Sequence, residues 1–267
     1  MKVVVGTYES LGACAADKVQ QLLYQRPNAV LGLATGSSPR PLYEELVNRC
    51  ERGEIRFSSA SAFTLDEYVG LPSGHPCSYR EVIQNDFAGR VNFASGAVKS
   101  PDVHSLDLVA ACQDYEREIH LAGGVDLQIL GVGVNGHIAF NEPGSLSDSR
   151  TRVTALTEQT RFDNARFFGG NLASVPTESV TQGLATIMEA REIIVFAFGV
   201  EKARAIREMV EGMQTIDWPA TMLQNHARVT VLVDADAASE LSPGPALPAK
   251  SIDSAGRQFR LSSGRLK

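Results

Sequence analysis

Asn135, His137 and Glu142 stand close together in the chain, directly behind three closely spaced glycines. An amide and a carboxylate beside an imidazole can fix its tautomer and tune its proton affinity. A histidine held in this way can serve as a general acid or a general base. A lone histidine beside apolar residues is more often structural, but the two polar neighbours in a glycine-rich turn favour a catalytic role for His137.

Asp66 and Glu67 form a second candidate, because they directly follow the apolar run 62–65. Two adjacent carboxylates at the end of a strand are often only part of a solvated turn. The carboxyl ends of strands are also where open α/β sheets bind their ligands, which would bring this pair toward His137. On the residues alone, the catalytic and the solvated interpretations both stay open.

Thr35, Gly36, Ser37 and Ser38 lie between a predicted buried strand at 29–34 and a predicted helix. Free N–H groups and hydroxyls at the start of a helix bind anions, and the helix dipole adds to this preference. An ordinary capped turn is the alternative. The sequence G-K-[ST] is missing, which excludes a Walker loop.

Arg166 and Lys202 are the basic side chains that we expect beside such an anion. Arg166 belongs to an arginine-rich segment within 144–177, and arginine pairs well with phosphate. Lys202 falls in the first turn of a predicted helix, where a cation is unfavourable unless an anion sits there. For both residues a solvated side chain remains the alternative.

The elements that must position these residues alternate between strand and helix along the chain. Apolar runs at 3–5, 29–34, 62–65, 127–132, 193–198 and 229–233 predict buried strands. Helical patterns separate most of them, so we expect one α/β domain over 1–267 with a mostly parallel central sheet flanked by helices. The segment from about 150 to 177, with Gly169 and Gly170, suits a mobile lid. The tail from about 242 is rich in Pro, Ser and Gly, and we expect it to be loosely held.

The sequence G-x-G-x-x-G at 131–136 is a weak signal for a dinucleotide site. A dinucleotide-binding motif would continue into a long helix, but Pro143 follows too soon for one. No acidic residue stands out at the usual distance either. We therefore expect no dinucleotide at this turn.

Composition excludes several other classes. The 267 residues are 43% hydrophobic and 21% charged, as in an ordinary globular protein, and the net charge of −6 offers no basic surface for nucleic acid. Four scattered cysteines without C-x-x-C spacing predict reduced thiols in a cytoplasmic protein and no zinc site. No apolar run approaches membrane-spanning length, and the first ten residues lack the apolar core of a signal peptide.

Five segments together resemble one family, the isomerising glucosamine-6-phosphate deaminases. They read LGLATGSSP, FTLDEYVGLP, GVGVNGHIAFNEPGS, SRTRVTAL and NARFF, and the resemblance runs in order from Lys2 to Leu241. It implies a modified Rossmann-like fold and a hydrolase of amino sugar catabolism that needs no metal or organic cofactor. The implied reaction turns D-glucosamine 6-phosphate and water into D-fructose 6-phosphate and ammonia. The implied partner is a sugar phosphate, and the chain could be a monomer or a homo-oligomer.

The resemblance also implies roles for the candidate residues. His137, tuned by Glu142 and Asn135, would open the sugar ring, and Asp66 would remove the proton at C2. Glu67 would only support Asp66. The phosphate would lie against Thr35, Gly36, Ser37 and Ser38, with Arg166 and Lys202 closing on it.

The chain departs from many family members at two places. Asn135 stands where many have Asp, so His137 depends more on Glu142. In the allosteric members an effector phosphate is held by two serines, a basic pair R-x-K and a C-terminal tyrosine. Here Ser145 and Arg152 remain, but the second serine, the lysine and the tyrosine are missing, since Leu146 and Thr154 stand in the first two places. We therefore expect no activation by N-acetylglucosamine 6-phosphate.

Two alternatives belong to other functional classes. A 6-phosphogluconolactonase usually has the segment DGHxASxFP where this chain reads NGHIAFNEP. A sugar-phosphate sensor resembling the effector domains of SorC-type repressors would carry a helix-turn-helix module, which this chain lacks. Such a sensor also has no need of Asp66, His137 and Glu142 together.

Overall fold

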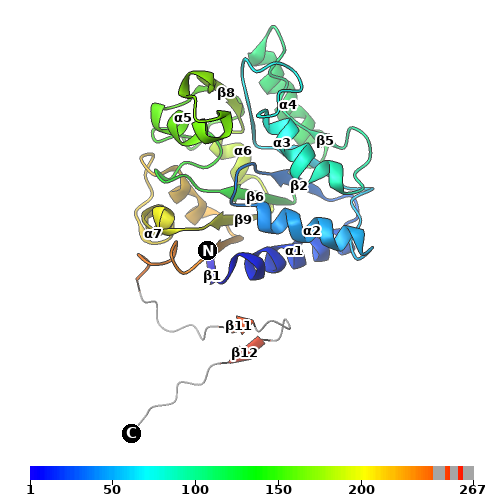
Figure 1. Cartoon of the computed structure of the whole chain (residues 1–267), viewed down its shortest axis with the longest axis vertical. Helices are drawn as coiled ribbons and strands as arrows, with labels where there is room; N and C mark the ends of the chain where they lie inside the picture. Colours follow the sequence, from blue (N-terminus) through cyan, green and yellow to red (C-terminus); the bar gives the residue numbers. More distant parts are fainter. Residues whose placement is uncertain (243–249, 253–257, 261–267) are drawn as a thin grey trace.

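A seven-stranded parallel sheet forms the centre of the computed structural model, which describes residues 1–242, 250–252 and 258–260 (Figure 1). The predicted α/β fold with a mostly parallel sheet is confirmed. In spatial order the strands are β1 (Lys2–Val5), β10 (Val229–Val233), β9 (Glu192–Ala197), β6 (Leu127–Gly131), β2 (Val30–Leu33), β3 (Ser61–Thr64) and β5 (Val98–Lys99).

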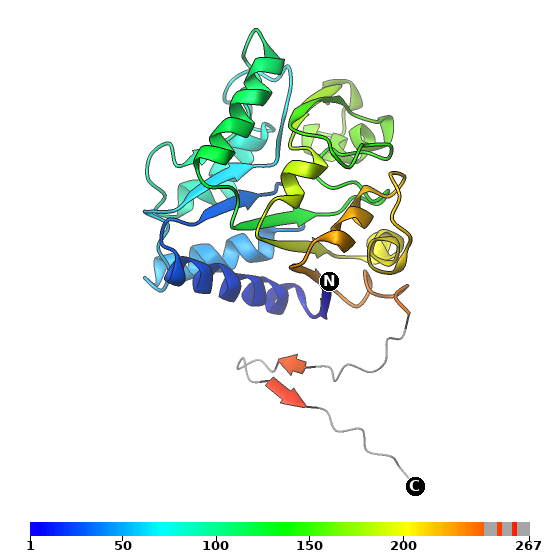
Figure 2. The same ribbon diagram turned by 180° about the vertical axis from the view of Figure 1, so that it is seen from behind.

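Helices cover both faces of this sheet, which is why its central strands are buried along almost their whole length and consist mostly of apolar residues. Figures 1 and 2 show α1 and α2 together on one side of the sheet, with α4 and the segment around α5 on the other. The helices are α1 (Tyr8–Gln25), α2 (Arg40–Glu51), α3 (Tyr79–Asp86), α4 (Leu108–Leu121), α5 (Glu158–Asn164), α6 (Leu184–Met188) and α7 (Ala203–Glu211). Short 3-10 helices are η1 (Ala88–Arg90), η2 (Ala165–Phe168), η3 (Leu172–Ser174), η4 (Val200–Lys202) and η5 (Pro219–Asn225).

The strand order reverses between β2 and β6. From β2 the chain continues outward to β3 and β5, whereas β6, β9 and β10 follow one another in the opposite direction. At such a reversal the loops that leave the two strands diverge and open a crevice. The turn at 35–38 leaves β2 and the glycine-rich turn leaves β6, so the fold brings both candidate segments to this crevice.

A second, antiparallel sheet corrects the prediction for Asp66. We expected Asp66 to follow the end of the strand at 62–65, but β3 ends at Thr64 and a new strand, β4 (Asp66–Tyr68), begins after Leu65. It pairs with β8 (Glu178–Thr181), which also pairs with β7 (Arg152–Ala155). This sheet packs over its own small apolar cluster of Tyr68, Phe140, Leu156, Ala165 and Val175.

The expected lid consists of β7, α5, η2 and η3, and its movement stays a prediction. Most of the tail expected from about residue 242 lies outside the described residues, apart from the antiparallel pair β11 (Lys250–Ile252) and β12 (Gln258–Arg260). Within the described residues, β6 and β7 are joined without a helix, as Pro143 indicated. None of the helices in the described part of the chain is long and apolar enough to cross a membrane.

Candidate active site

A cavity of about 980 Å³ opens at the carboxyl ends of β2 and β6. Segments far apart in the sequence meet there, including the turn after β2, the start of β4, the glycine-rich turn, η2 and η4. Of the predicted site residues, those that line the cavity are Thr35, Gly36, Ser37, Ser38, Asp66, His137, Arg166 and Lys202. Asn135 and Glu142 lie behind the wall, where they contact His137. Glu67 also lies behind the wall, next to Asp66.

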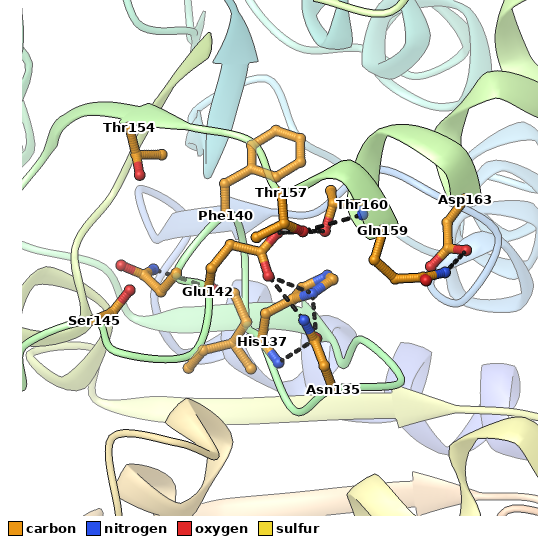
Figure 3. Close-up of polar contacts among 12 residues, drawn as sticks. Asn135, His137, Phe140, Glu142, Ser145, Thr154, Thr157, Gln159, Thr160 and Asp163 are labelled. Atoms are coloured by element: carbon orange, nitrogen blue, oxygen red, sulfur yellow. Dashed lines mark hydrogen bonds and ion pairs between the residues drawn. The ribbon is translucent and has the colours of Figure 1, made fainter. Parts of the chain in front are cut away.

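Asn135 connects Glu142 to His137 through two hydrogen bonds (Figure 3). Its Nδ2 donates to Glu142 Oε2 at 2.9 Å, and its Oδ1 lies 2.7 Å from His137 Nδ1. Because the amide oxygen can only accept, this orientation of Asn135 requires the proton to be on Nδ1 of His137. The Nε2 atom then carries a free lone pair in a side chain that lines the cavity.

His137 is mostly buried, and this burial lowers its pKa, although the Glu142 carboxylate 3.6 Å away opposes the shift. Nearby Lys202 lowers the pKa of His137 further. The imidazole is therefore neutral at neutral pH. A neutral imidazole with a free Nε2 can accept a proton from one oxygen and return it to another.

Two glycines of the turn are required by close contacts. A Cβ on Gly133 would lie 2.2 Å from His137 Cε1, so the imidazole packs directly on the peptide backbone there. Gly136 has φ of +80°, and a Cβ on it would lie 2.5 Å from Cε3 of Trp218. The glycine-rich turn therefore packs against the imidazole of His137 at Gly133 and against the indole of Trp218 at Gly136.

Sequence reasoning missed the two hydroxyls that hold Glu142. Thr157 Oγ1 donates to Glu142 Oε1 at 3.2 Å, and Thr160 Oγ1 donates to the same oxygen. Thr157 caps α5 and Thr160 lies in that helix, so the carboxylate that supports His137 is fixed from the expected lid (Figure 3). Threonines in a helix cap carry no sequence signal for such a contact.

Asp66 is buried, with only 5% of its surface exposed, yet it lines the cavity. Burial raises its pKa well above the ordinary value, and the neighbouring Glu67 carboxylate raises it further. No hydrogen bond to its carboxylate occurs within the described part of the chain. A carboxylate that accepts no hydrogen bond and has a raised pKa is suited to removing a proton from carbon.

Glu67 points away from the cavity and anchors a helix. Its carboxylate accepts the backbone N–H groups of Tyr68, Tyr79 and Arg80 at 2.8 to 2.9 Å. The last two belong to the first turn of α3, so Glu67 satisfies amides that the helix itself leaves free. Ser78, the residue before α3, accepts from the Glu81 amide, whereas the amides of Tyr79 and Arg80 go to Glu67. Glu67 thereby fixes β4 against α3.

Arg166 and Lys202 also line the cavity. The Arg166 guanidinium lies over the ring of Phe167, 4.8 Å from its centre. Burial lowers the pKa of Lys202, and the charge of nearby Arg166 lowers it too. Neither side chain forms an ion pair within 4.0 Å among the described residues, so both cations remain available to an anion.

The described residues contain no group of three or more His, Cys, Asp or Glu side chains that could hold a metal ion. The four cysteines, all within the described residues, are free thiols.

Comparisons with known proteins place the chain in a family. The family model described as glucosamine-6-phosphate isomerases/6-phosphogluconolactonase matches residues 6–232. The glucosamine-6-phosphate deaminase of Beutenbergia cavernae is 58% identical over 239 residues, covering 90% of this chain and 92% of that protein. The deaminase of Mycolicibacterium smegmatis is 59% identical over 231 residues, covering 86% and 88%.

Solved structures agree with this assignment. A monomeric glucosamine-6-phosphate deaminase superposes with a TM-score of 0.87 at 40% identity, covering 90% of this chain and all (100%) of that one. A 6-phosphogluconolactonase from Thermotoga maritima superposes with a TM-score of 0.69 at 23% identity, covering 87% and 97%, which shows a shared fold. The chain therefore belongs to the glucosamine-6-phosphate isomerase/6-phosphogluconolactonase family.

Proposed function

We propose that this protein is a glucosamine-6-phosphate deaminase, which converts D-glucosamine 6-phosphate and water into D-fructose 6-phosphate and ammonia. The names of its relatives support this activity. The observation that carries it is a cavity that holds two separate proton-transfer groups, a neutral His137 and a buried Asp66. An aldose–ketose isomerisation of a cyclic sugar needs both groups, one to move a proton between oxygens as the ring opens and one to move a proton between carbons.

His137 is the group that we propose for ring opening. Its Nε2 takes the proton of the O1 hydroxyl while the C1–O5 bond breaks, and it returns that proton to O5. Asn135 keeps Nδ1 protonated and Glu142 stabilises the imidazolium that forms in between. The result is the open-chain aldehyde, with its C2 proton made acidic by the carbonyl group.

Asp66 is the base that we propose for the next step. It removes the proton from C2, the electron pair forms the C1–C2 double bond, and O1 takes up a proton to give an enolamine. Return of a proton from Asp66 to C1 produces a C2 iminium ion. Water adds at C2 and ammonia leaves, so the overall reaction is a hydrolytic deamination coupled to isomerisation.

The phosphate end of the substrate belongs, in this proposal, between the turn at 35–38 and the two cations Arg166 and Lys202. Arg166 lies on η2, within the segment that we expect to close as a lid. Binding the phosphate there would hold the reacting carbons near Asp66 and His137. Positioning of this kind can lower a barrier by several kcal/mol, roughly 7–11 in the best oriented cases.

The decisive experiment follows ammonia release and fructose 6-phosphate formation from glucosamine 6-phosphate. A parallel assay with 6-phosphogluconolactone tests the related hydrolase, and galactosamine 6-phosphate tests the choice of amino sugar. We expect both products from glucosamine 6-phosphate at a one-to-one ratio. Hydrolysis of the lactone without release of ammonia from glucosamine 6-phosphate would refute the proposal and indicate a 6-phosphogluconolactonase instead. The free thiols support a cytoplasmic location for this catabolic step.

A further inference from the structure

Gln182 is a fully buried side chain directly after β8, and it binds the two peptide groups that precede Asp66. Its backbone N–H donates to the Leu65 carbonyl at 2.8 Å. Its side-chain Nε2 donates to the Thr64 carbonyl at 3.0 Å. Gln182 therefore bonds both carbonyl groups at the point where the chain leaves β3 and enters β4, and the Tyr115 hydroxyl donates to the Thr64 carbonyl as well, at 2.7 Å.

Asp66 depends on this support because its own carboxylate has no hydrogen bond to any described residue. Its place is set by the backbone, through pairing with Thr181 of β8 and through the two carbonyls that Gln182 holds. Because no hydrogen bond from a described residue holds the Asp66 carboxylate, its position depends on how firmly the backbone at Asp66 is held.

The backbone carbonyl of Gln182 contacts the loop that carries His137 and Glu142. It accepts a hydrogen bond from Asn141 Nδ2 at 2.8 Å, and the same Nδ2 donates to the Ile138 carbonyl at 3.0 Å. Asn141 precedes Glu142, and Ile138 follows His137. Gln182 thus joins the peptide groups before Asp66 to the loop that carries the histidine and its carboxylate.

We propose that Gln182 is a positioning residue that sets the separation between Asp66 and the His137–Glu142 unit. This inference rests on the proposed function, in which both groups act on one sugar. The two halves lie in different sheets and loops, and Gln182 is bonded to both. A misplacement of about 1 Å can lower turnover roughly 10²-fold without removing any reacting group.

A general role in stability is the competing explanation, and Gln128 offers a matched control. Gln128 is also fully buried, its Nε2 donates to a backbone carbonyl at 2.9 Å, and its Oε1 has no partner, as is true of Gln182 Oε1. Its amide bonds within its own strand, β6, and packs on Gly32. Loss of either side-chain amide should therefore cost similar stability, but only the Gln182 amide holds the backbone that leads into Asp66.

The experiment compares Gln182→Met with Gln128→Met in the full chain, measuring kcat, KM, melting temperature and the pH profile of kcat/KM. We expect kcat of Gln182→Met to fall at least roughly tenfold, with KM changed less than about twofold. If the backbone around Asp66 loosens in Gln182→Met, water reaches the carboxyl more easily and its pKa falls, since burial is what raises that pKa. The acidic limb of the kcat/KM profile should therefore move to lower pH. Gln128→Met should keep kcat and the pH profile of the wild type.

Equal kcat values in the two variants would overturn the inference. If Gln182→Met does not fold, Asn141→Asp tests the other part of the connection, because it removes the hydrogen bond to the Gln182 backbone carbonyl while keeping the size of the side chain and the contact with Arg152. Wild-type kcat in that variant would be equally decisive against Gln182. Failure of the wild type to release ammonia would instead refute the proposed function, so the two failures are distinguishable.

Discussion

Asp66 and His137 show how one cavity can tune two side chains in opposite directions. Burial raises the pKa of the carboxyl and lowers that of the imidazole, because in both cases the neutral form is favoured away from water. Asp66 becomes a stronger base and His137 stays unprotonated at neutral pH. The loss of activity on acidification should accordingly reflect protonation of both groups.

Replacing Asp66 by Asn should abolish most turnover while substrate still binds. The amide has the size of the carboxylate but cannot remove the C2 proton, so we expect kcat to fall by about 10²–10⁴-fold with little change in KM. The wild type in D2O should place solvent deuterium at C1 of fructose 6-phosphate, to an extent limited by internal return of the proton. Turnover near that of the wild type in the variant would refute the assignment.

The same substitution should stabilise the fold at neutral pH. The folded-state pKa of Asp66 is raised, so its ionised form opposes folding above that pKa, and the penalty disappears as pH falls to the ordinary value of about 4. Asp66→Asn should melt at a higher temperature than the wild type near pH 8, with the difference vanishing near pH 4. The exposed Asp114, replaced by Asn, should show no comparable gain. A loss of stability near pH 8 would contradict the prediction.

The sequence predicted the chemistry of the site better than its supports. Asn135, His137 and Glu142 lie within eight positions, so local spacing alone indicated that they meet. Thr160 and Gln182 lie 18 and 41 positions from the residues that they bind, Glu142 and Asn141. Their contacts exist only once α5 and β8 have packed, and no local pattern encodes that.

At the scale of elements, the candidate phosphate site depends on three separate pieces of backbone. The turn at 35–38 precedes α2, Arg166 lies on η2, and Lys202 ends η4. Two of these are short 3-10 helices at the edge of the cavity. We therefore expect the two cations to move relative to the turn more easily than residues within the sheet do.

Removal of either cation should weaken binding of the phosphorylated substrate. Arg166→Ala and Lys202→Ala should each raise KM strongly, since losing a charge-assisted contact costs about 1.5–3 kcal/mol. Arg117→Ala, which removes an exposed charge on α4, is the control and should leave KM unchanged. Unphosphorylated glucosamine should be a very poor substrate for the wild type. Wild-type KM values in both site variants would place the phosphate elsewhere.

The long elements were predictable and the short ones were not. Buried strands such as β9 and β10 match the expected ranges closely, because four or more apolar residues in succession leave a clear pattern. The three strands of the second sheet have only three or four residues and mixed polarity. In addition, Leu65 continues the apolar run of β3, which hides the break before Asp66.

For the whole molecule, the question is whether a second site controls the first. Arg152 is half-buried and donates to Asn141 Oδ1 at 2.9 Å and to Ser145 Oγ at 3.3 Å, and burial lowers its pKa. The allosteric proteins that this chain resembles add a lysine and a second serine at this place. Here those positions hold Thr154 and the exposed Leu146.

We therefore expect hyperbolic kinetics that N-acetylglucosamine 6-phosphate does not change. Two missing contacts, each worth roughly 1–3 kcal/mol, exceed the coupling of about 1–3 kcal/mol that an effector typically supplies. Initial rates against glucosamine 6-phosphate, with and without the effector at millimolar concentration, provide the test. A sigmoidal curve that becomes hyperbolic with effector would show that Arg152 and Ser145 suffice.

Trp218, the single tryptophan of the chain, packs against Gly136 of the glycine-rich turn, with Arg204 over its ring at 5.3 Å from the centre. Intrinsic fluorescence excited at the indole therefore reports on the loop that carries His137, without labels or interference from another indole. A change in emission as fructose 6-phosphate is added would give a dissociation constant directly. The same signal would follow ligand binding in Asp66→Asn, where we expect little turnover.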